Sequence, residues 1–294
     1  MPTKSKKSKP VKHGVYINLL TDFGFKRIFG TEANKDLLID FLNLVLKIDG
    51  GIKELNFINT ETRGSLKKDR TSVFDLHCTT GKNERIIIEV QNHSHKNFKD
   101  RGLFYLGRTI SELGKKGKDW NFELPTIYSI NITNFKLNKK EKKEDYISEI
   151  MLTDIKTGKI FYKKLKIVYI ELPRFKIKEE DLKTDIERWI YFFKNIYKLK
   201  KLPEGITSKI FKKLFEQAKI ANMTPEELNK YNISLKKYLD MNVVINEYKE
   251  KLAAKDKKIE NITAKWNYEK AAWAYEKEQM RQMLKQLGVN FPNA

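Results

Sequence analysis

Cysteine and long apolar runs are both scarce in this sequence. Cys78 is the only cysteine among 294 residues, so neither a disulfide framework nor a cysteine-based metal site is available. No run approaches the roughly 20 apolar residues that a membrane-spanning helix needs, and the lysines near the N-terminus precede no signal-peptide core. We therefore expect a cytoplasmic protein in a reducing compartment.

Acidic residues are outnumbered by basic ones. The chain has 38 Asp and Glu against 59 Lys and Arg, which gives a formal net charge of +21. This excess favours a polyanionic partner such as DNA, because basic side chains release the counterions that condense on a phosphate backbone. Solvated surface lysines are the alternative explanation. The apolar content of 40% is sufficient for a substantial core.

Hydrophobic periodicity predicts an α/β fold. Apolar residues at helical spacing indicate helices, and short apolar runs bounded by turn residues indicate strands. Helices are predicted near Asp22 and over 34–46 and 98–114. Strands are predicted over 53–60, 71–91 (as a hairpin), 125–133, 146–152 and 160–172. From residue 179 onward the pattern indicates helices alone.

Four regions follow from these patterns. Residues 1–14 are lysine-rich without an acid and are predicted to be a disordered basic arm. Residues 15–175 are predicted to form a mixed central sheet flanked by helices. A helical subdomain is expected over 176–241 and a long helix over 242–294.

The last helices carry two further signals. The segment TPEEL predicts a helix start, with Thr224 as N-cap, Pro225 in the first helical position and Glu227 in the third. Beyond it an apolar residue recurs every seven positions: Ile245, Leu252, Ile259, Trp266, Trp273, Met280 and Leu287. The companion series is half polar: Tyr248, Lys255, Ile262, Glu269, Glu276 and Met283. This pattern is typical of a coiled coil, so we expect a homodimer through this helix, with packing against the chain's own domain as the alternative.

The predicted hairpin carries acids inside apolar strands. Side chains alternate between faces along a strand, so Asp75 shares a face with His77, and Glu89 shares one with Gln91. Turn-forming residues at 81–83 join the strands, and we expect Asp75 and Glu89 on one face. Two buried carboxylates close together need a cation. A metal site is therefore predicted here, and an exposed face with ordinary polar residues is the alternative.

The helices on either side of the hairpin add polar candidates. Asp22 stands where the first helix begins and can act as its N-cap. Helix 98–114 is predicted to bury Leu103, Phe104, Leu106, Ile110 and Leu113. Its other face offers Arg101, Tyr105 and Arg108, spaced to contact a phosphate backbone together, and solvated arginines are the alternative.

A family resemblance rests on an ordered series of segments. Asp75, followed by Glu89-Val90-Gln91 on the next strand, resembles the D...(D/E)xK signature of the PD-(D/E)XK nuclease superfamily. The segments LLTDFGFKRIFG, NKDLLIDFLN, FDLHC, IIIEVQN, FKDRGLFYLGR and DIERWIYFFK are similar to the recombination-promoting nuclease and putative transposase family within it. The resemblance covers roughly residues 15 to 240 and implies a PD-(D/E)XK nuclease-like core followed by an α-helical C-terminal region.

The resemblance implies a role for each matching residue. Asp75 and Glu89 would coordinate Mg²⁺ or Mn²⁺, helped by the carbonyl of Val90. Asp22 matches an acidic position that the superfamily contributes from its first helix. Gln91 departs from the superfamily pattern, because it replaces a lysine and can only orient water or phosphate by hydrogen bonds. Glutamine is nevertheless usual in the resembling family.

The implied function is a divalent-metal-dependent DNA endonuclease that hydrolyses phosphodiester bonds and is associated with mobile elements or recombination. Glu61, His93 and His95 border the motif and are minor candidates, with ordinary loop residues as the alternative. The sequence contains no helix-turn-helix or zinc-finger pattern, which predicts low sequence specificity. A non-catalytic DNA-binding or assembly protein on a nuclease-like fold is the alternative.

Overall fold

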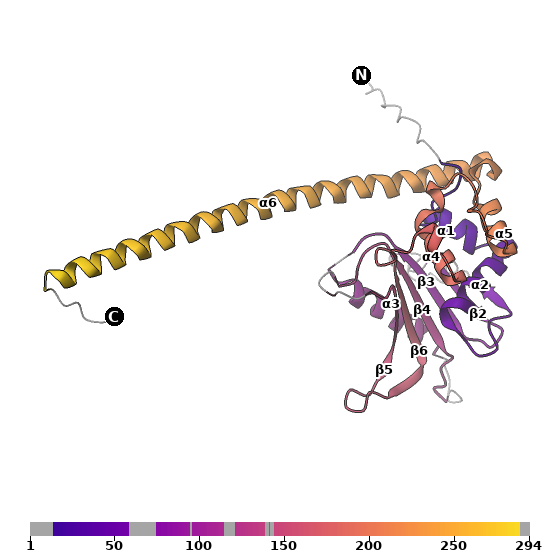
Figure 1. Cartoon of the computed structure of the whole chain (residues 1–294). Helices are drawn as coiled ribbons and strands as arrows, with labels where there is room; N and C mark the ends of the chain where they lie inside the picture. Colours follow the sequence, from indigo (N-terminus) through magenta and orange to yellow (C-terminus); the bar gives the residue numbers. More distant parts are fainter. Residues whose placement is uncertain are drawn as a thin grey trace, which may run out of the picture. The chain divides into compact units, whose positions relative to one another are not determined.

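Six strands form one mixed sheet in the computed structural model, which describes residues 14–58, 75–94, 96–114, 121–138, 141 and 144–288 (Figure 1). The strands are β1 (Leu55–Phe57), β2 (Leu76–Thr80), β3 (Arg85–Gln91), β4 (Ile127–Thr133), β5 (Ile147–Thr153) and β6 (Ile160–Glu171). They lie in the order β1-β2-β3-β4-β6-β5. The β3–β4 and β4–β6 pairs are parallel and the other three are antiparallel. The predicted α/β fold with a mixed sheet is confirmed.

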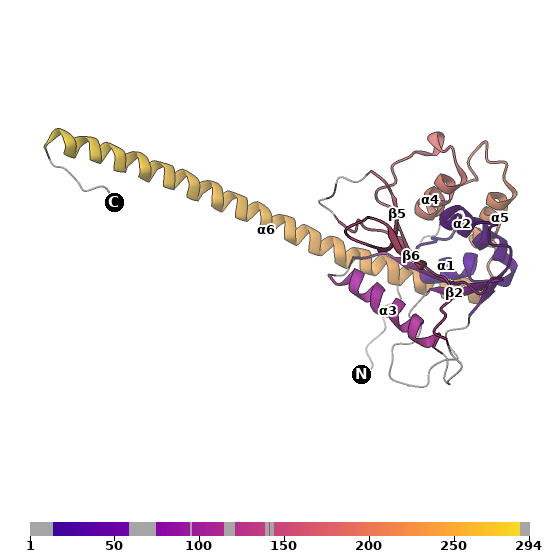
Figure 2. The ribbon, with the colours of Figure 1, turned by 90° about the horizontal axis from the view of Figure 1, so that it is seen from below.

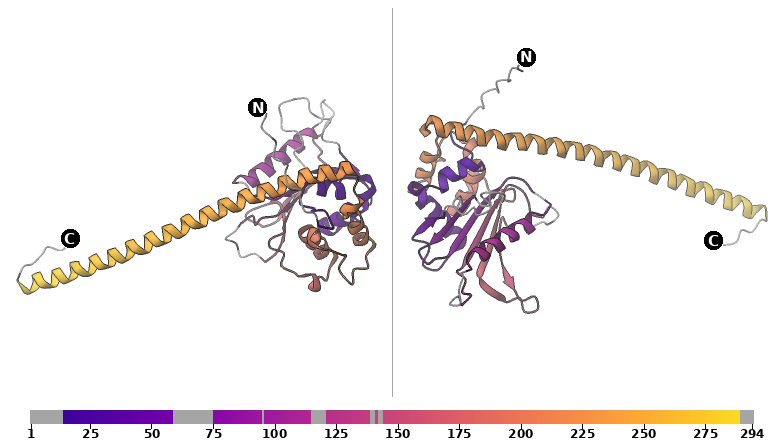
Figure 3. Two further views of the ribbon diagram at one scale, coloured as in Figure 1. Left: turned by 90° about the horizontal axis from the view of Figure 1, so that it is seen from above. Right: turned by 180° about the vertical axis from the view of Figure 1, so that it is seen from behind.

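Helices cover both faces of this sheet. The described helices are α1 (Asp22–Phe29), α2 (Lys35–Leu46), α3 (Phe98–Glu112), α4 (Asp185–Asn195), α5 (Lys209–Ala218) and α6 (Pro225–Gln286), with short 3-10 helices η1 (Glu32–Asn34), η3 (Glu179–Asp181), η4 (Ile196–Lys198) and η5 (Ile220–Asn222). Figure 2 shows α3 on one face, with α1, α2, α4 and α5 on the other. Seen from behind, α3 lies across the strands (Figure 3). None of the described helices has the length and apolar content to cross a membrane.

The face of α3 that meets the sheet differs in part from the prediction. Leu106 is buried and packs against Ile87 of β3, and Ile110 adds to this core. Leu103 and Phe104, however, are 56% and 70% exposed, so their predicted burial is wrong. Successive helical residues are 100° apart, and Phe104 therefore points about 200° away from Leu106.

An aromatic core joins helices that are far apart in the sequence. The ring of Phe29 on α1 stacks on Phe193 of α4, with 5.2 Å between centroids, and Trp189 lies 5.6 Å from Phe29. The indole Nε1 of Trp189 donates a hydrogen bond of 2.7 Å to Asp40 of α2. Because the buried indole N–H has this acceptor, it costs little to bury the whole ring. The late helix α4 thus packs on α1 and α2 as one layer.

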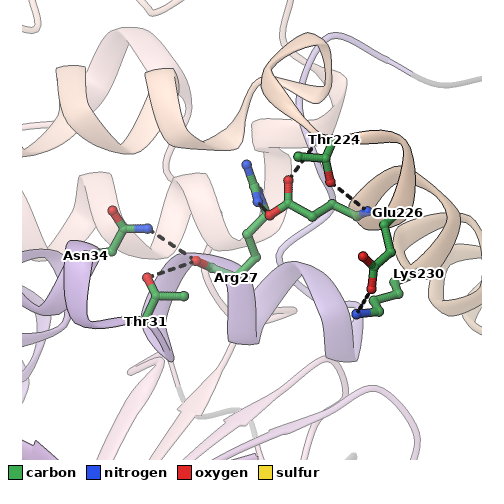
Figure 4. Close-up of polar contacts among 7 residues, drawn as sticks. Arg27, Thr31, Asn34, Thr224, Glu226 and Lys230 are labelled. Carbon is green, nitrogen blue, oxygen red and sulfur yellow. Dashed lines mark hydrogen bonds and ion pairs between the residues drawn. The ribbon is translucent and has the colours of Figure 1, made fainter.

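The first turns of α6 are fastened to α1. The predicted capping box is confirmed, since the Glu227 N–H donates to Thr224 Oγ1 at 3.2 Å and the Thr224 N–H donates to Glu227 Oε2 at 3.0 Å. Arg27 of α1 forms an ion pair with Glu227 (Figure 4). One and two turns further along α6, Tyr231 and Ser234 accept hydrogen bonds from backbone N–H groups on either side of the α1 start.

Helix α6 then continues without a break to Gln286. The helix predicted from Thr224 and the terminal helix predicted from 242 are therefore one element. By its internal contacts the chain divides into two compact units, one that ends at Lys236 and one that begins at Lys237. Most of the predicted basic arm, residues 1–13, lies outside the described residues.

A matched pair of substitutions tests the orientation of α3. Leu106→Ala is expected to lower the free energy of unfolding by about 2–5 kcal/mol, because it leaves a cavity against the sheet. Leu103→Ala should change it by no more than about 0.5 kcal/mol, because that side chain is exposed. Urea unfolding of both variants measures the difference. Equal losses would mean that Leu103 is buried as first predicted.

Candidate active site between the sheet and helix α3

Three neighbouring strands contribute a buried polar row on one face of the sheet. The parallel register places Glu89 of β3 beside Asn131 of β4, and Asn131 beside Tyr169 of β6. Each of these residues is at most 6% exposed. The face is the one that α3 covers, since Ile87 two residues before Glu89 packs against Leu106.

Asp75 lies immediately before β2, in the predicted hairpin. His77 is opposite Ile87, and the same antiparallel register continued by two residues brings Asp75 level with Glu89. Oδ2 of Asp75 accepts a hydrogen bond of 2.6 Å from the backbone N–H of Val90. The two carboxyl groups are close enough for the charge of Asp75 to raise the pKa of Glu89. The structure thus brings the two predicted acids together.

Burial raises the pKa of both carboxyl groups. Loss of hydration is the main reason that the pKa of Glu89 rises to about 7, and the negative charge of Asp75 adds to the effect. Burial likewise raises the pKa of Asp75 to about 6, although the hydrogen bond from Val90 opposes the shift. The positive charge of Arg101 lowers the pKa of both groups. A guanidinium therefore lies within electrostatic reach of the two acids.

The carboxylate of Glu89 fits a cation. Its Oε2 accepts a hydrogen bond of 3.2 Å from Nε2 of Gln91, whereas its Oε1 is buried and has no hydrogen-bond partner among the described residues. The described residues contain no group of three His, Cys, Asp or Glu side chains that could hold a metal. Further ligands would then be carbonyl oxygens such as that of Val90, or water, and Mg²⁺ and related hard cations accept both.

The start of α1 lies near Asp75, but Asp22 is not its N-cap. Thr21 takes that position, and its side chain accepts a hydrogen bond from the N–H of Gly24. The predicted capping role of Asp22 is therefore wrong, because the helix starts one residue earlier than that role requires. The exposed Asp22 carboxylate pairs with Lys26 at 2.8 Å, and the charges of both residues act on the pKa of Asp75.

Asn92 connects this helix start to the end of β3. Its Nδ2 donates a hydrogen bond of 2.6 Å to the carbonyl oxygen of Leu20, directly before the N-cap Thr21. The residue that follows Glu89-Val90-Gln91 in the sequence thus ties the motif strand to α1. As a result, the start of α1, where Asp22 lies, is fixed at the end of β3.

The three polar residues predicted on α3 differ in their contacts. The positive charge of Arg101 lowers the pKa of both acids, and its guanidinium lies 5.8 Å from the ring centroid of Tyr105. Arg108 is exposed and forms an ion pair of 3.1 Å with Glu112 on its own helix. Arg101 therefore acts on both acids and lies next to Tyr105, whereas Arg108 is paired with Glu112.

Several residues near the acids were not singled out from the sequence. Asn131 is paired with Glu89, and Tyr169 is paired with Asn131 on the next strand. The charge of Glu89 raises the pKa of Tyr169 after the larger effect of burial. The sequence contains one signal for Asn131, because a polar asparagine stands inside the apolar run IYSINIT. Of the minor candidates, Glu61 and His95 lie outside the described residues, and His93 follows the end of β3.

Comparison with models of known protein families shows to which family the chain belongs. Residues 19–248 match the family model of the PD-(D/E)XK nuclease family transposase. The chain belongs to this family. The match includes α1, α3 and all six described strands, and it confirms the resemblance inferred from the sequence. No curated protein and no solved structure matched the chain.

Because Glu89 is buried, replacing it with a neutral side chain is expected to stabilise the fold, by an amount that depends on pH. Its pKa is raised on folding, so its stabilising contribution is present below about pH 4.5 and is lost as the pH rises through about 7. Without metal, Glu89→Gln should therefore be more stable than the wild type at pH 8, on the order of 1–3 kcal/mol. The gain should shrink towards pH 5. Thermal unfolding in EDTA at both pH values measures it.

Glu84→Gln is the matched control on the same hairpin. Glu84 accepts hydrogen bonds from Thr80 and Tyr128, so its replacement should bring no such gain. A Glu89→Gln variant that is less stable than the wild type at pH 8 would contradict the expectation.

Proposed function

We propose that this family member is a divalent-metal-dependent DNA endonuclease that hydrolyses phosphodiester bonds with low sequence specificity, in recombination or on mobile elements. The observation that supports this most is the buried Glu89 carboxylate beside Asp75, with one oxygen that has no partner among the described residues. Such a pair is costly to keep as two charges unless a cation joins it.

Each residue of the site has a distinct task in this proposal. Asp75, Glu89 and the carbonyl of Val90 would hold Mg²⁺ or Mn²⁺. When bound, such an ion polarises a phosphoryl oxygen and lowers the pKa of water. The amide of Gln91 fixes Oε2 of Glu89 by its hydrogen bond, and it stays neutral where the superfamily pattern has a lysine. Asp22 would assist from α1 through a water molecule.

Positive charge near the site would bind the DNA backbone. Arg101 would hold a phosphate next to the acids, and its guanidinium lies 5.8 Å from the ring centroid of Tyr105, as in a cation–π contact. Arg108 would add a weaker contact at the outer end of the helix. Contacts of this kind go to phosphate rather than to base edges, and they carry no direct sequence information.

Plasmid nicking in Mg²⁺ or Mn²⁺ tests the catalytic proposal. Asp75→Asn and Glu89→Gln should each lower the rate by at least about 10–100-fold, because ligand loss costs more than loss of a supporting contact. Glu84→Gln, at the far end of the same hairpin, should cut at the wild-type rate. If Asp75→Asn or Glu89→Gln cut as fast as the wild type, the site assignment would be wrong.

Metal titration separates this proposal from a non-catalytic DNA-binding protein on the same fold. Calorimetry should detect Mn²⁺ binding to the wild type and not to Glu89→Gln. Salt-sensitive DNA binding without any Mn²⁺ binding by the wild type would favour the non-catalytic alternative.

The two arginines of α3 should respond differently to removal. Arg101→Ala is expected to reduce nicking and DNA affinity clearly, with partial recovery in Arg101→Lys, because the guanidinium faces the acids. Arg108→Ala should change DNA affinity less than 3-fold, roughly 0.5 kcal/mol, because its charge is already paired with Glu112 and is exposed. Fluorescence anisotropy with a labelled duplex gives both affinities. A larger loss for Arg108→Ala would reverse the assignment.

A further inference from the structure

The second compact unit exposes an apolar seam along α6. We define the α6 seam as every seventh residue from Ile245 to Leu287, the first series, together with the residues three positions after each, the companion series, which ends at Met283. Trp266 and Trp273 of the first series are 59% and 64% exposed. The first series is apolar at every position, and an exposed apolar repeat of this kind marks an interaction surface, because scattered apolar residues would leave no repeat.

The repeat of the seam specifies the kind of partner. A strict seven-residue repeat has 3.5 residues per turn, slightly fewer than a straight helix, so it stays buried only when two helices supercoil around each other. The seam extends over roughly 60 Å at 1.5 Å per residue. A second copy of this chain supplies a helix of equal length and identical repeat.

The area available is sufficient for a stable pair. Tyr248, Trp266 and Trp273 are about 60–70% exposed, and side chains of this size bury roughly 150–250 Å² each. In two chains these aromatics alone would bury on the order of 500–900 Å². The aliphatic residues of the seam add to this buried area and bring the total towards the roughly 1,200–2,000 Å² that stable interfaces bury.

Charges within the seam decide the direction of pairing. The companion series contains Lys255, Glu269 and Glu276 among its apolar members. In a parallel pair in register, each of these would face its own copy, and like charges brought together are strongly unfavourable. In an antiparallel pair, companion positions face the first series of the other chain, which is apolar throughout. We infer that α6 forms an antiparallel homodimer.

One antiparallel register uses the seam best. It sets Ile245 against Met283 of the second copy, Trp266 against Ile262, and Trp273 against Lys255. The ammonium of Lys255 then lies on an indole face, an attraction that α6 already shows within one chain, where Lys277 lies 5.2 Å from the Trp273 ring centroid.

The glutamates find basic neighbours in the same register. Glu276 is level with Leu252 of the second copy, which is flanked by Lys251 and Lys255. Glu269 is level with Ile259, which follows Lys258. A shift by one heptad in one direction sets Trp266 against Glu269, and a shift in the other direction moves Met280 and Met283 beyond the seam of the second copy, opposite Met241 and Tyr238. The pairing is independent of the proposed nuclease activity.

Sedimentation equilibrium of the full chain tests the pairing. A mass of twice 34.7 kDa is expected. Trp266→Glu with Trp273→Glu should give a monomer, since both residues belong to the seam. The matched control is Tyr268→Glu with Tyr275→Glu, which changes equally exposed aromatics outside the seam and should leave the dimer intact. A wild-type monomer at high concentration, or an assembly larger than a dimer, would overturn the inference.

Cysteine crosslinking tests the direction. The native Cys78 is buried, and burial raises the pKa of its thiol to about 12, so it contributes little background. Ile245→Cys and Met283→Cys chains, separately tagged, are mixed and oxidised with diamide. The mixture should form a disulfide between the two kinds of chain, and neither variant alone should crosslink. Crosslinks within each variant alone would show parallel pairing and reject the antiparallel assignment.

Discussion

A carboxylate on a central strand that is also covered by a helix loses most of its hydration, and Glu89 is in this position. Arg101 and Gln91 offset part of that loss, whereas the charge of Asp75 adds to it. Asp75 and Arg101 come from different elements, yet both act on the charge of Glu89. Gln91 holds one oxygen and leaves the other without a partner in the described structure. These neighbours leave part of the cost of burying Glu89 without an offset, which agrees with the cation that we propose for this site.

The position of α1 depends on residues that come about two hundred positions later. Its aromatic side is held by Trp189 and Phe193 of α4, and its first turn receives contacts from Tyr231 and Ser234 of α6. The residues that bind the start of α1 therefore also set where Asp22 stands relative to Asp75. A helical layer that looks remote from the chemistry in sequence is part of its support.

Local patterns were the reliable part of sequence interpretation. Alternation along the strands correctly grouped Asp75 with Glu89, and the pattern TPEEL correctly predicted the capping box at Thr224. Each of these two patterns is complete within a short stretch of sequence. Long-range packing was not available in the same way. Which face of α3 is buried depends on the sheet beneath it, so Phe104 was misplaced, and Asn131 reaches Glu89 only through a parallel register that no local pattern contains.

The hydrogen bond from Asn92 to the Leu20 carbonyl has a consequence for how such chains can vary in length. It closes the segment between α1 and β3 into a loop whose two ends are joined beside the acids. Residues added at the exposed turn around Lys82 would leave these joined ends in place, whereas the register between β2 and β3 still sets Asp75 beside Glu89. One side-chain amide therefore fixes the entry to α1 beside the end of β3, and the hairpin register separately fixes the two acids.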